Sequence, residues 1–418
     1  MAATSAALTK NTSNDSTQTQ WFALSSLGTL FFMFGFITCL NDILIPYLKG
    51  LFDLSYAQAM LVQFCFFFAY FVMSIPSGII VARVGYKNGI IGGLALSSIG
   101  CFIFYPAAEM AVYSMFLLAL FVLASGITLL QVSANPYVSA LGPSKTASSR
   151  LTLTQAFNSL GTTIAPFFGA WLIFDHVSTQ QAATAESVQL PYLLLAGSLL
   201  IIAGVFSLLK LPDMGRGENV SFSPKNVLQH RHLKLGAVAI FLYVGAEVAI
   251  GSFIVSYLTQ SHIVGFSEGK ASTYIAYYWG GAMVGRFIGA LIMQYVSANK
   301  VLMINALLAI LLVSVVIVGE GKLAMYALLS IGLCNSIMFP TIFSLAIDEL
   351  GIETSHGASV LCLAIVGGAI VPYCQGLFAD FTNVQLSFAI PVFCYLFIVY
   401  YGLAGFRVKS STKMEALS

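Results

Sequence analysis

Long apolar segments recur along this chain, and they constrain its fold more than any single motif does. A helical membrane crossing needs about 20 apolar residues, because the hydrocarbon core of a bilayer is about 30 Å thick. Twelve segments meet this need, and their approximate spans are 21–48, 56–82, 88–106, 110–142, 149–174, 191–210, 233–261, 269–295, 300–318, 322–348, 356–379 and 384–406. With 58% hydrophobic and 8% charged residues, the chain has too much apolar surface for a soluble globule. We therefore expect an all-α integral membrane protein with twelve transmembrane helices.

The basic residues are distributed unevenly between the two sides of the expected membrane. If both termini face the cytoplasm, that side receives fifteen Lys and Arg residues, and the opposite side receives Lys49, Lys270 and Lys322. Such an excess marks the cytoplasmic loops of membrane proteins. We therefore expect a multi-pass protein of a bacterial inner membrane with both termini in the cytoplasm. Because topology explains the asymmetry, the net charge of +2 gives no indication of a nucleic acid or an acidic partner.

A long polar stretch divides the apolar segments into two sets of six. It covers residues 211–232, and we expect a cytoplasmic linker there between an N-terminal bundle, 21–210, and a C-terminal bundle, 233–407. The polar ends of the chain, 1–20 and 408–418, are expected to be cytoplasmic tails, the first of them disordered.

The two sets of six segments resemble each other. The matched pairs are Phe31 with Phe241, Gly35 with Gly245, Tyr47 with Tyr257, Pro136 with Pro340, Gly161 with Gly367, Pro166 with Pro372 and Gly169 with Gly376. Membrane helices also share glycine and proline through composition alone, which is the alternative explanation. A parallel duplication predicts two pseudo-symmetric bundles with a substrate site between them, near the middle of the bilayer.

Two carboxylates lie well inside the apolar segments. Of sixteen Asp and Glu residues, only Asp42 and Glu247 have such a position. A charge at the centre of a membrane helix costs roughly 2.5–3.5 kcal/mol on insertion scales, so it persists where it faces a wet cavity or a cation. The repeat alignment places Glu247 opposite Ile37, about 7.5 Å along the axis from Asp42, and one cavity could hold both. The alternative for either acid is a structural hydrogen bond to a neighbouring helix.

Uncharged polar residues occur in the same segments. Gln131 and Asn135 are four residues apart, and Gln155 and Asn158 are three apart, so each pair shares one face of a helix. The others are Asn41, beside Asp42, and Asn335. Amides and carboxylates donate and accept at many angles, which suits the hydroxyls of a sugar better than a hydrophobic drug. Their alternative role is to join helices by hydrogen bonds.

Segment 269–295 carries a run of aromatic residues followed by a stripe of glycines. Tyr278 and Trp279 lie midway along it, so stacking on a sugar ring is one role, with lipid contact or core packing as the alternative. The glycine stripe predicts the close approach of another helix. Arg286 is expected to anchor the cytoplasmic end of the segment to lipid headgroups or to pair with an acid in a loop, with a gating role as the alternative.

Nothing in the sequence indicates an enzyme or a bound cofactor. The five histidines fall in loops or at helix ends, and no HExxH, GxSxG or phosphate-binding glycine loop occurs in a suitable context. All seven cysteines fall inside the expected spans without ligand-like spacing, so we expect neither a disulfide nor a cysteine-bound metal.

Longer motifs add a family resemblance. The stretches LNDILIPYL, QVSANPYVSALGP, RLTLTQAFNSLGT and FPTIFSLAI resemble the fucose:proton symporter family of the major facilitator superfamily. FLYVGAEVAIGSF and YYWGGAMVGRFIG resemble its glucose/galactose transporter branch. The resemblance implies two six-helix bundles that rock against each other, with a sugar and a coupling cation bound between them.

The resemblance also implies roles for individual residues. It gives coupling to Asp42 and sugar contacts to Gln155 and Asn158, and it matches Asn135 to the Asn of the family's NP pair. Two positions depart from the fucose symporter pattern: Gln131 stands where that family has a second protonatable carboxylate, and Glu247 stands where it has a Gln. Consequently, its proton coupling cannot be transferred whole.

Together these observations predict a secondary active transporter that carries a hexose such as glucose or galactose with a cation. The residues expected to bind the sugar are Asn135, Gln155, Asn158, Glu247, Tyr278, Trp279 and Asn335. The cation is either H⁺, taken up by Asp42, or Na⁺, held by oxygen atoms of Asp42, Asn41, Gln131 and Asn135. The alternatives are proton symport of a 6-deoxy or N-acetylated sugar and, with a cavity richer in aromatics and Met, a drug/proton antiporter. We expect a monomer in either case.

Overall fold

The structure, a computed structural model, describes residues 19–52, 56–169, 189–212 and 228–408. Within these ranges the description does not extend to the side chains of residues 38–47, 49–51, 56–60, 63, 166–169 and 268. Nearly all of the two expected tails and most of the expected linker lie outside the described residues.

Long helices make up the N-terminal half. They are α1 (Trp21–Leu51), α2 (Tyr56–Val84), α3 (Tyr86–Met110), α4 (Tyr113–Ala140), the short 3₁₀ helix η1 (Ser144–Thr146), α5 (Ala147–Gly169) and α6 (Gln189–Leu208). Within this half, α4 packs against α2 and α3, α1 packs against α5, and α3 packs against α6.

The C-terminal half repeats this pattern with more interruptions. Its helices are α8 (Arg231–Leu258), α9 (Glu268–Thr273), α10 (Ile275–Ile292), α11 (Ala298–Val318), α12 (Gly321–Asn335), α13 (Met338–Ala346), η4 (Gly351–Glu353), α14 (Thr354–Leu363), η5 (Ala364–Val366), α15 (Gly367–Phe381), α16 (Val384–Ser387), α17 (Ala389–Tyr400) and η6 (Tyr401–Gly405). Here α8 packs against α15 and α17, and α12 packs against α10 and α11.

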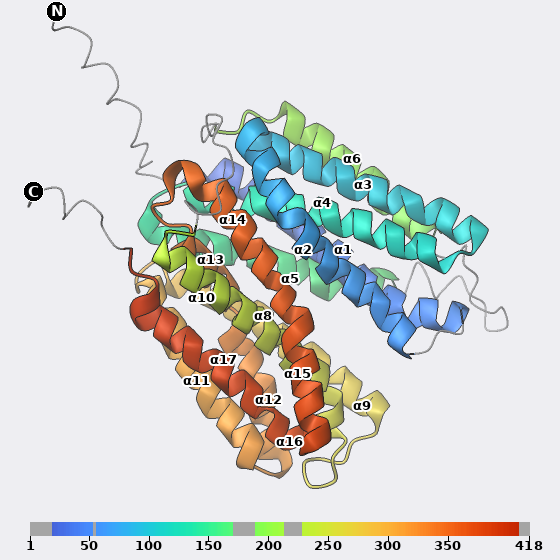
Figure 1. Cartoon of the computed structure of the whole chain (residues 1–418), viewed down its shortest axis with the longest axis vertical. Coiled ribbons are helices and arrows are strands. Elements are labelled where there is room, and N and C mark those ends of the chain that lie inside the picture. The colour runs from blue at the N-terminus through green and yellow to red at the C-terminus, as the bar shows by residue number, and fades with distance from the viewer. Residues whose placement is uncertain (1–18, 53–55, 170–188, 213–227, 409–418) are drawn as a thin grey trace, which may run out of the picture.

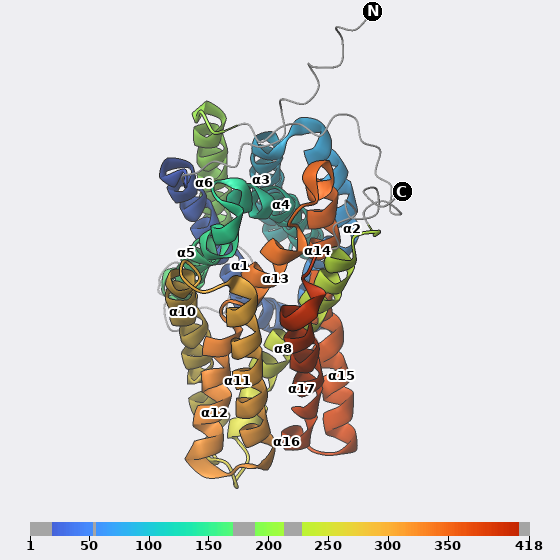
Figure 2. The same cartoon turned by 90° about the vertical axis from the view of Figure 1, so that its left-hand side faces the viewer.

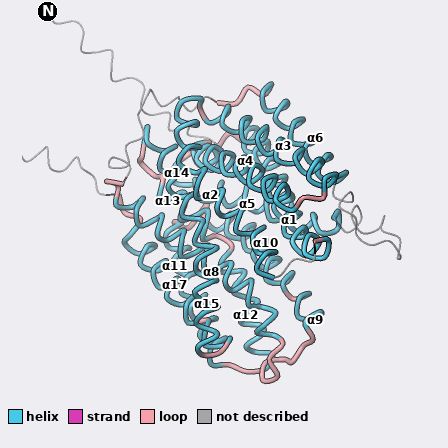
Figure 3. The backbone as a smooth tube through the Cα atoms, turned by 45° about the vertical axis from the view of Figure 1, so that its right-hand side comes forward, coloured by secondary structure: helices cyan, strands magenta, loops and turns pink. Residues whose placement is uncertain are grey.

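These helices correspond to the twelve expected spans, and the prediction of an all-α membrane fold is confirmed. Ten helical stretches of the described chain are long and apolar enough to cross a membrane. Two of the expected spans are not among these ten. In α1 the apolar part with described side chains covers Trp21–Ile37, which is too short to cross a membrane, and α5 carries many hydroxyl and amide side chains. No strand occurs in the part of the chain that Figure 3 colours.

The two halves form separate bundles that meet at one end of the molecule (Figure 1). At this end, which we call the closed end, α5 packs against α10 and α13, while α14 packs against α2 and α4. Away from it the bundles diverge, so that α1 and α15 point in different directions (Figures 1 and 2). The closed end therefore contains the contacts that must break if the bundles are to separate there.

Matched glycines hold equivalent helix pairs together in the two halves. A Cβ atom on Gly161 of α5 would lie 2.1 Å from the carbonyl oxygen of Phe32 on α1. A Cβ atom on Gly367 of α15 would lie 2.0 Å from the carbonyl oxygen of Phe241 on α8. Small residues permit such backbone approach between membrane helices. The alignment of Gly161 with Gly367 thus corresponds to the same packing contact in each bundle.

Candidate functional site

Buried amide groups without partners mark the N-terminal bundle. Gln131 of α4 donates a hydrogen bond of 2.8 Å from Nε2 to the hydroxyl of Tyr70 on α2. Its Oε1 atom is buried and has no hydrogen-bond partner among the described residues. One turn along α4, Asn135 is completely buried, and neither Nδ2 nor Oδ1 has a partner within the described chain. An unmade buried hydrogen bond is costly, so these atoms need a partner that the described residues do not supply.

Helix α5 connects this region to α1. Gln155 is buried, and Asn158 donates a 3.1 Å hydrogen bond from Nδ2 to the carbonyl oxygen of Phe31. Gln131 and Phe31 also line one narrow crevice between α4 and α1. Gln131 of α4 and Asn158 of α5 therefore both lie beside Phe31 of α1.

The predicted coupling residues Asn41 and Asp42 belong to α1, but their side chains lie outside the description. Gln131 shares its crevice with Leu30, Phe31 and Phe34 of that helix. Asp42 is eight residues beyond Phe34, which corresponds to about 12 Å along a helix axis. Since the ligands of one ion must all touch it, this spacing does not favour a Na⁺ site shared by Asp42, Gln131 and Asn135.

Two predicted sugar ligands of the C-terminal bundle belong to a buried network. Asn335 is fully buried at the end of α12; its Nδ2 donates to the Tyr278 hydroxyl at 2.8 Å, and its Oδ1 accepts from the Tyr395 hydroxyl at 2.7 Å. Tyr278 in turn donates to the carbonyl oxygen of Glu247 at 3.3 Å. The network joins α8, α10, α12 and α17, so in this conformation Asn335 and Tyr278 bind protein groups.

Trp279 differs from its neighbour. Its side chain is 38% exposed, and its ring packs edge-on against Tyr278 with centroids 5.2 Å apart. The ring also lies 3.5 Å from the position of a Cβ atom on Gly251 of α8. A partly exposed indole supported from behind is a suitable platform for stacking on a sugar ring, and this role remains a prediction.

Arg286 connects the two bundles, and its expected role as a headgroup anchor is wrong. Its Nη1 donates to the Ser159 hydroxyl on α5 of the opposite bundle, and its Nε donates to the carbonyl oxygen of Ser336 at 3.2 Å. Its Nη2 lies 3.9 Å from Oε1 of Glu247. The guanidinium faces protein because the bundles converge here, which position along the sequence does not reveal. The neighbouring Gly285 serves close packing as predicted, since a Cβ there would lie 2.5 Å from Ser336 Oγ.

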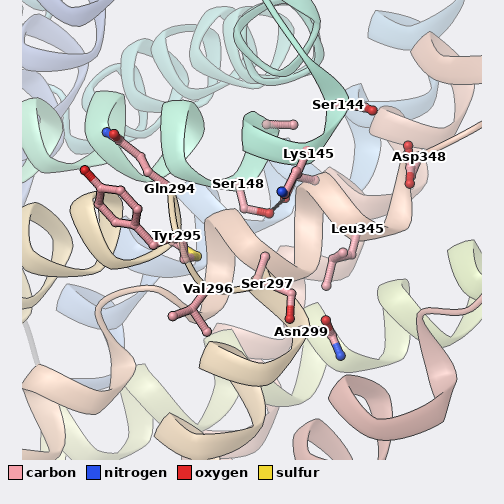
Figure 4. A pocket seen from close by; sticks show the side chains of 14 residues that line it. Ser144, Lys145, Ser148, Gln294, Tyr295, Val296, Ser297, Asn299, Leu345 and Asp348 are labelled. Atoms are coloured by element: carbon pink, nitrogen blue, oxygen red, sulfur yellow. Dashed lines mark hydrogen bonds between the residues drawn. The ribbon is translucent and has the colours of Figure 1, made fainter.

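Further contacts at the closed end surround a cavity of about 270 Å³ (Figure 4). The hydroxyls of Ser148 on α5 and Ser344 on α13 are 2.6 Å apart. Lys145 and Asp348 line the cavity from opposite bundles. Burial, and secondarily the nearby charge of Glu349, raises the pKa of the Asp348 carboxyl. These contacts hold the N- and C-terminal halves together at one end.

No group of three or more His, Cys, Asp or Glu side chains that could hold a metal occurs among the described residues. The two bundles, the buried amides and the buried carboxylate of Glu247 are features typical of a transport protein. A family model described as the Major Facilitator Superfamily matches residues 26–372. The chain belongs to the major facilitator superfamily.

Individual members of this superfamily are similar over nearly the whole chain. A glucose/galactose transporter of Brucella abortus (strain 9-941) is 54% identical over 398 residues, which cover 94% of this chain and 97% of that protein. An L-fucose-proton symporter of Escherichia coli (strain K12) is 35% identical over 415 residues, with 94% of each chain covered. The crystal structure of the major facilitator FucP in the outward conformation has a TM-score of 0.83 and 34% identity, covering 91% of this chain and 97% of the other.

Sequence reasoning missed several residues of this major facilitator site. Ser159 and Ser336 gave no signal, because a hydroxyl in an apolar helix usually bonds to its own backbone. Tyr70 and Tyr395 lie in aromatic runs that indicate only burial. Arg286 did carry a signal, since a cation inside an apolar segment is costly unless it has a partner such as Glu247.

Proposed function

We propose that this chain is a secondary active transporter, and not an enzyme, that carries a hexose such as glucose or galactose together with a cation. The observation that supports this most strongly is the 54% identity to a glucose/galactose transporter along nearly the full length of both chains. The buried, unpartnered amide atoms of Gln131 and Asn135 support a polar ligand, because a sugar hydroxyl can both donate to and accept from them.

The closed end is assigned to the cytoplasm, and the molecule to an outward-open state. The excess of basic residues on the membrane side that carries both termini supports the orientation. The similarity to a transporter solved in the outward conformation supports the state. In this assignment the sugar enters from outside, and the contacts at the closed end break before it is released inside. The protein acts as a monomer in a bacterial inner membrane.

The coupling cation is assigned as H⁺, carried by Asp42. A proton needs one carboxylate, whereas Na⁺ needs several oxygen ligands, and the position of Asp42 along α1 does not favour sharing an ion with Gln131. The relative with 35% identity is named for proton symport. Closing the bundles around an ionised Asp42 would bury an unpaired charge. Protonation of Asp42 therefore lowers the free-energy cost of the conformational change and couples proton movement to sugar movement.

Uptake into proteoliposomes tests this function. Labelled glucose, galactose, N-acetylglucosamine and fucose are offered under an imposed H⁺ gradient and, separately, under a Na⁺ gradient. We expect accumulation of glucose or galactose above equilibrium with the H⁺ gradient alone, and its loss in Asp42→Asn. Accumulation driven by the Na⁺ gradient alone would identify Na⁺ as the coupling cation. Efflux of a hydrophobic dye without sugar uptake would favour a drug antiporter.

A further inference from the structure

The guanidinium of Arg286 forms hydrogen bonds to both bundles. On the side of the C-terminal bundle it donates to the carbonyl oxygen of Ser336 and approaches Glu247. Across the interface it donates to the hydroxyl of Ser159. Ser159 is anchored in turn, because its hydroxyl donates to the carbonyl oxygen of Gln155 at 3.1 Å, one turn earlier on α5. Arg286 is thus bonded to a helix that must move away if the closed end opens.

The ion pair between Arg286 and Glu247 is incomplete. Its separation of 3.9 Å exceeds the roughly 2.7–2.9 Å of a charge-assisted hydrogen bond. Oε1 of Glu247 is buried and has no hydrogen-bond partner within the described chain. Each side chain is only 12% exposed, so water compensates little. Although the Glu247 carboxyl also has a hydrogen bond with the side chain of Tyr243, its Oε1 atom is poorly stabilised, and the Arg286 cation lies 3.9 Å from that atom.

The cross-bundle bond explains this separation. While Nη1 is bonded to Ser159 across the interface, the guanidinium is held with Nη2 3.9 Å from Oε1 of Glu247. Separation of the bundles at the closed end would remove Ser159 from Nη1, and the guanidinium, still bonded through Nε to Ser336, could then turn toward Glu247. The new bond to Glu247 would then compensate for the bond lost to Ser159.

We propose that Arg286 exchanges partners during transport. It binds Ser159 while the two bundles are in contact at the closed end, and it binds Glu247 once they separate there. The exchange rests on the alternating access proposed above. It gives Glu247 a role beyond sugar contact, as the residue that stabilises the open form of this end. A transporter must visit both states, and the exchange keeps their free energies close because each state offers the same cation one good partner.

A thiol at the closed end reports its opening. Ser148 is 5% exposed and faces Ser344, so the thiol introduced by Ser148→Cys should react faster with a maleimide when the bundles separate there than through the cavity that Ser148 lines in the closed form. The reaction is followed on purified full-length protein in detergent without sugar. Peptide mass spectrometry reads position 148 separately from the native cysteines, of which Cys374 is exposed.

The two partners of Arg286 should change the alkylation rate in opposite directions. A hydrogen bond to a charged group is worth about a tenfold change in a two-state equilibrium. We expect Ser159→Ala to raise the rate about tenfold and Glu247→Gln to lower it by a similar factor. Ser159→Thr keeps a hydroxyl and should leave the rate near that of the parent. Thr162→Val, which removes a hydroxyl bonded only within α5 at 2.9 Å, should have no effect.

Opposite signs distinguish partner exchange from a merely structural ion pair. Misfolding can raise the reactivity of a buried thiol but cannot lower it, so a slower reaction in Glu247→Gln is diagnostic. Rates that rise in both variants, or that change in neither, would overturn the proposal. The assay contains no sugar and no ion gradient, so absence of hexose uptake with the opposite signs intact would contradict the proposed function alone.

Discussion

Gln131 of α4 donates its amide hydrogen to the hydroxyl of Tyr70 on α2 over 2.8 Å, and its carbonyl oxygen has no partner among the described residues. The tyrosine therefore fixes which way the amide points. It leaves the acceptor free beside the crevice that α4 shares with α1. The hydroxyl of Tyr70 thus holds the amide of Gln131 in one orientation.

Tyr70→Phe should weaken sugar binding through loss of this orientation. We expect the KM of hexose uptake to rise about three- to tenfold, because the freed amide can rotate and its unpaired donor is costly when buried. Tyr137→Phe is the matched control: it removes a hydroxyl that bonds to the carbonyl oxygen of Pro212 at 2.7 Å, in the same bundle but away from Gln131. Equal KM values for the two variants would contradict an orienting role for Tyr70.

Gln131→Glu should introduce a second group that binds a proton. A buried carboxyl favours its neutral form, so its pKa rises, and transport should require protonation at position 131. We expect the uptake rate to fall as the pH rises through that pKa, shifting the alkaline limb of the pH profile to lower pH. The parent and Gln131→Asn serve as references without a carboxyl. A profile identical to the parent, with transport retained, would show that this position does not take part in coupling.

Asn335→Ala should act mainly on stability. It removes the partner of two buried tyrosine hydroxyls, those of Tyr278 and Tyr395, and each unsatisfied group costs about 1–3 kcal/mol. We expect a lower unfolding temperature in detergent and little change in sugar affinity for the molecules that remain folded. A large loss of affinity without a change in stability would restore Asn335 as a direct sugar ligand.

Asn135→Ala should show the converse behaviour. Because neither polar atom of Asn135 has a partner in the described chain, removing them breaks no bond that the structure contains. We expect an unchanged or higher unfolding temperature and a Kd for sugar raised about tenfold, equivalent to about 1.4 kcal/mol. Isothermal titration with galactose and thermal unfolding of the same preparation measure both quantities. Destabilisation with intact affinity would make Asn135 a structural residue.

The sequence was sufficient for the fold because apolar length and helix breaks are local properties. Each expected span, including the one interrupted between α12 and α13, could be read from hydropathy. The hydrogen-bond and ion-pair partners of individual residues were harder to predict, because hydropathy gives the depth of a residue in the membrane but not the helix that it faces. Arg286 illustrates this, since its depth suggested a lipid headgroup whereas convergence of the bundles directs it to Ser159 and Glu247. Asn335 was recognised as buried and polar, but its tyrosine partners come from α10 and α17.

The glycine contacts between bundled helices allow a prediction about folding that is independent of transport. A Cβ on Gly161 would lie 2.1 Å from a backbone oxygen of α1, which no side-chain rotation can relieve, so α1 and α5 would have to separate. We expect Gly161→Ala to lower the unfolding temperature substantially, and the matched Gly367→Ala to do the same through α8 and α15. Gly204→Ala in α6 is the control, because nothing lies within 4 Å of its added methyl group. Helix propensity alone favours alanine over glycine at all three positions, so uniform stabilisation would refute the close approach.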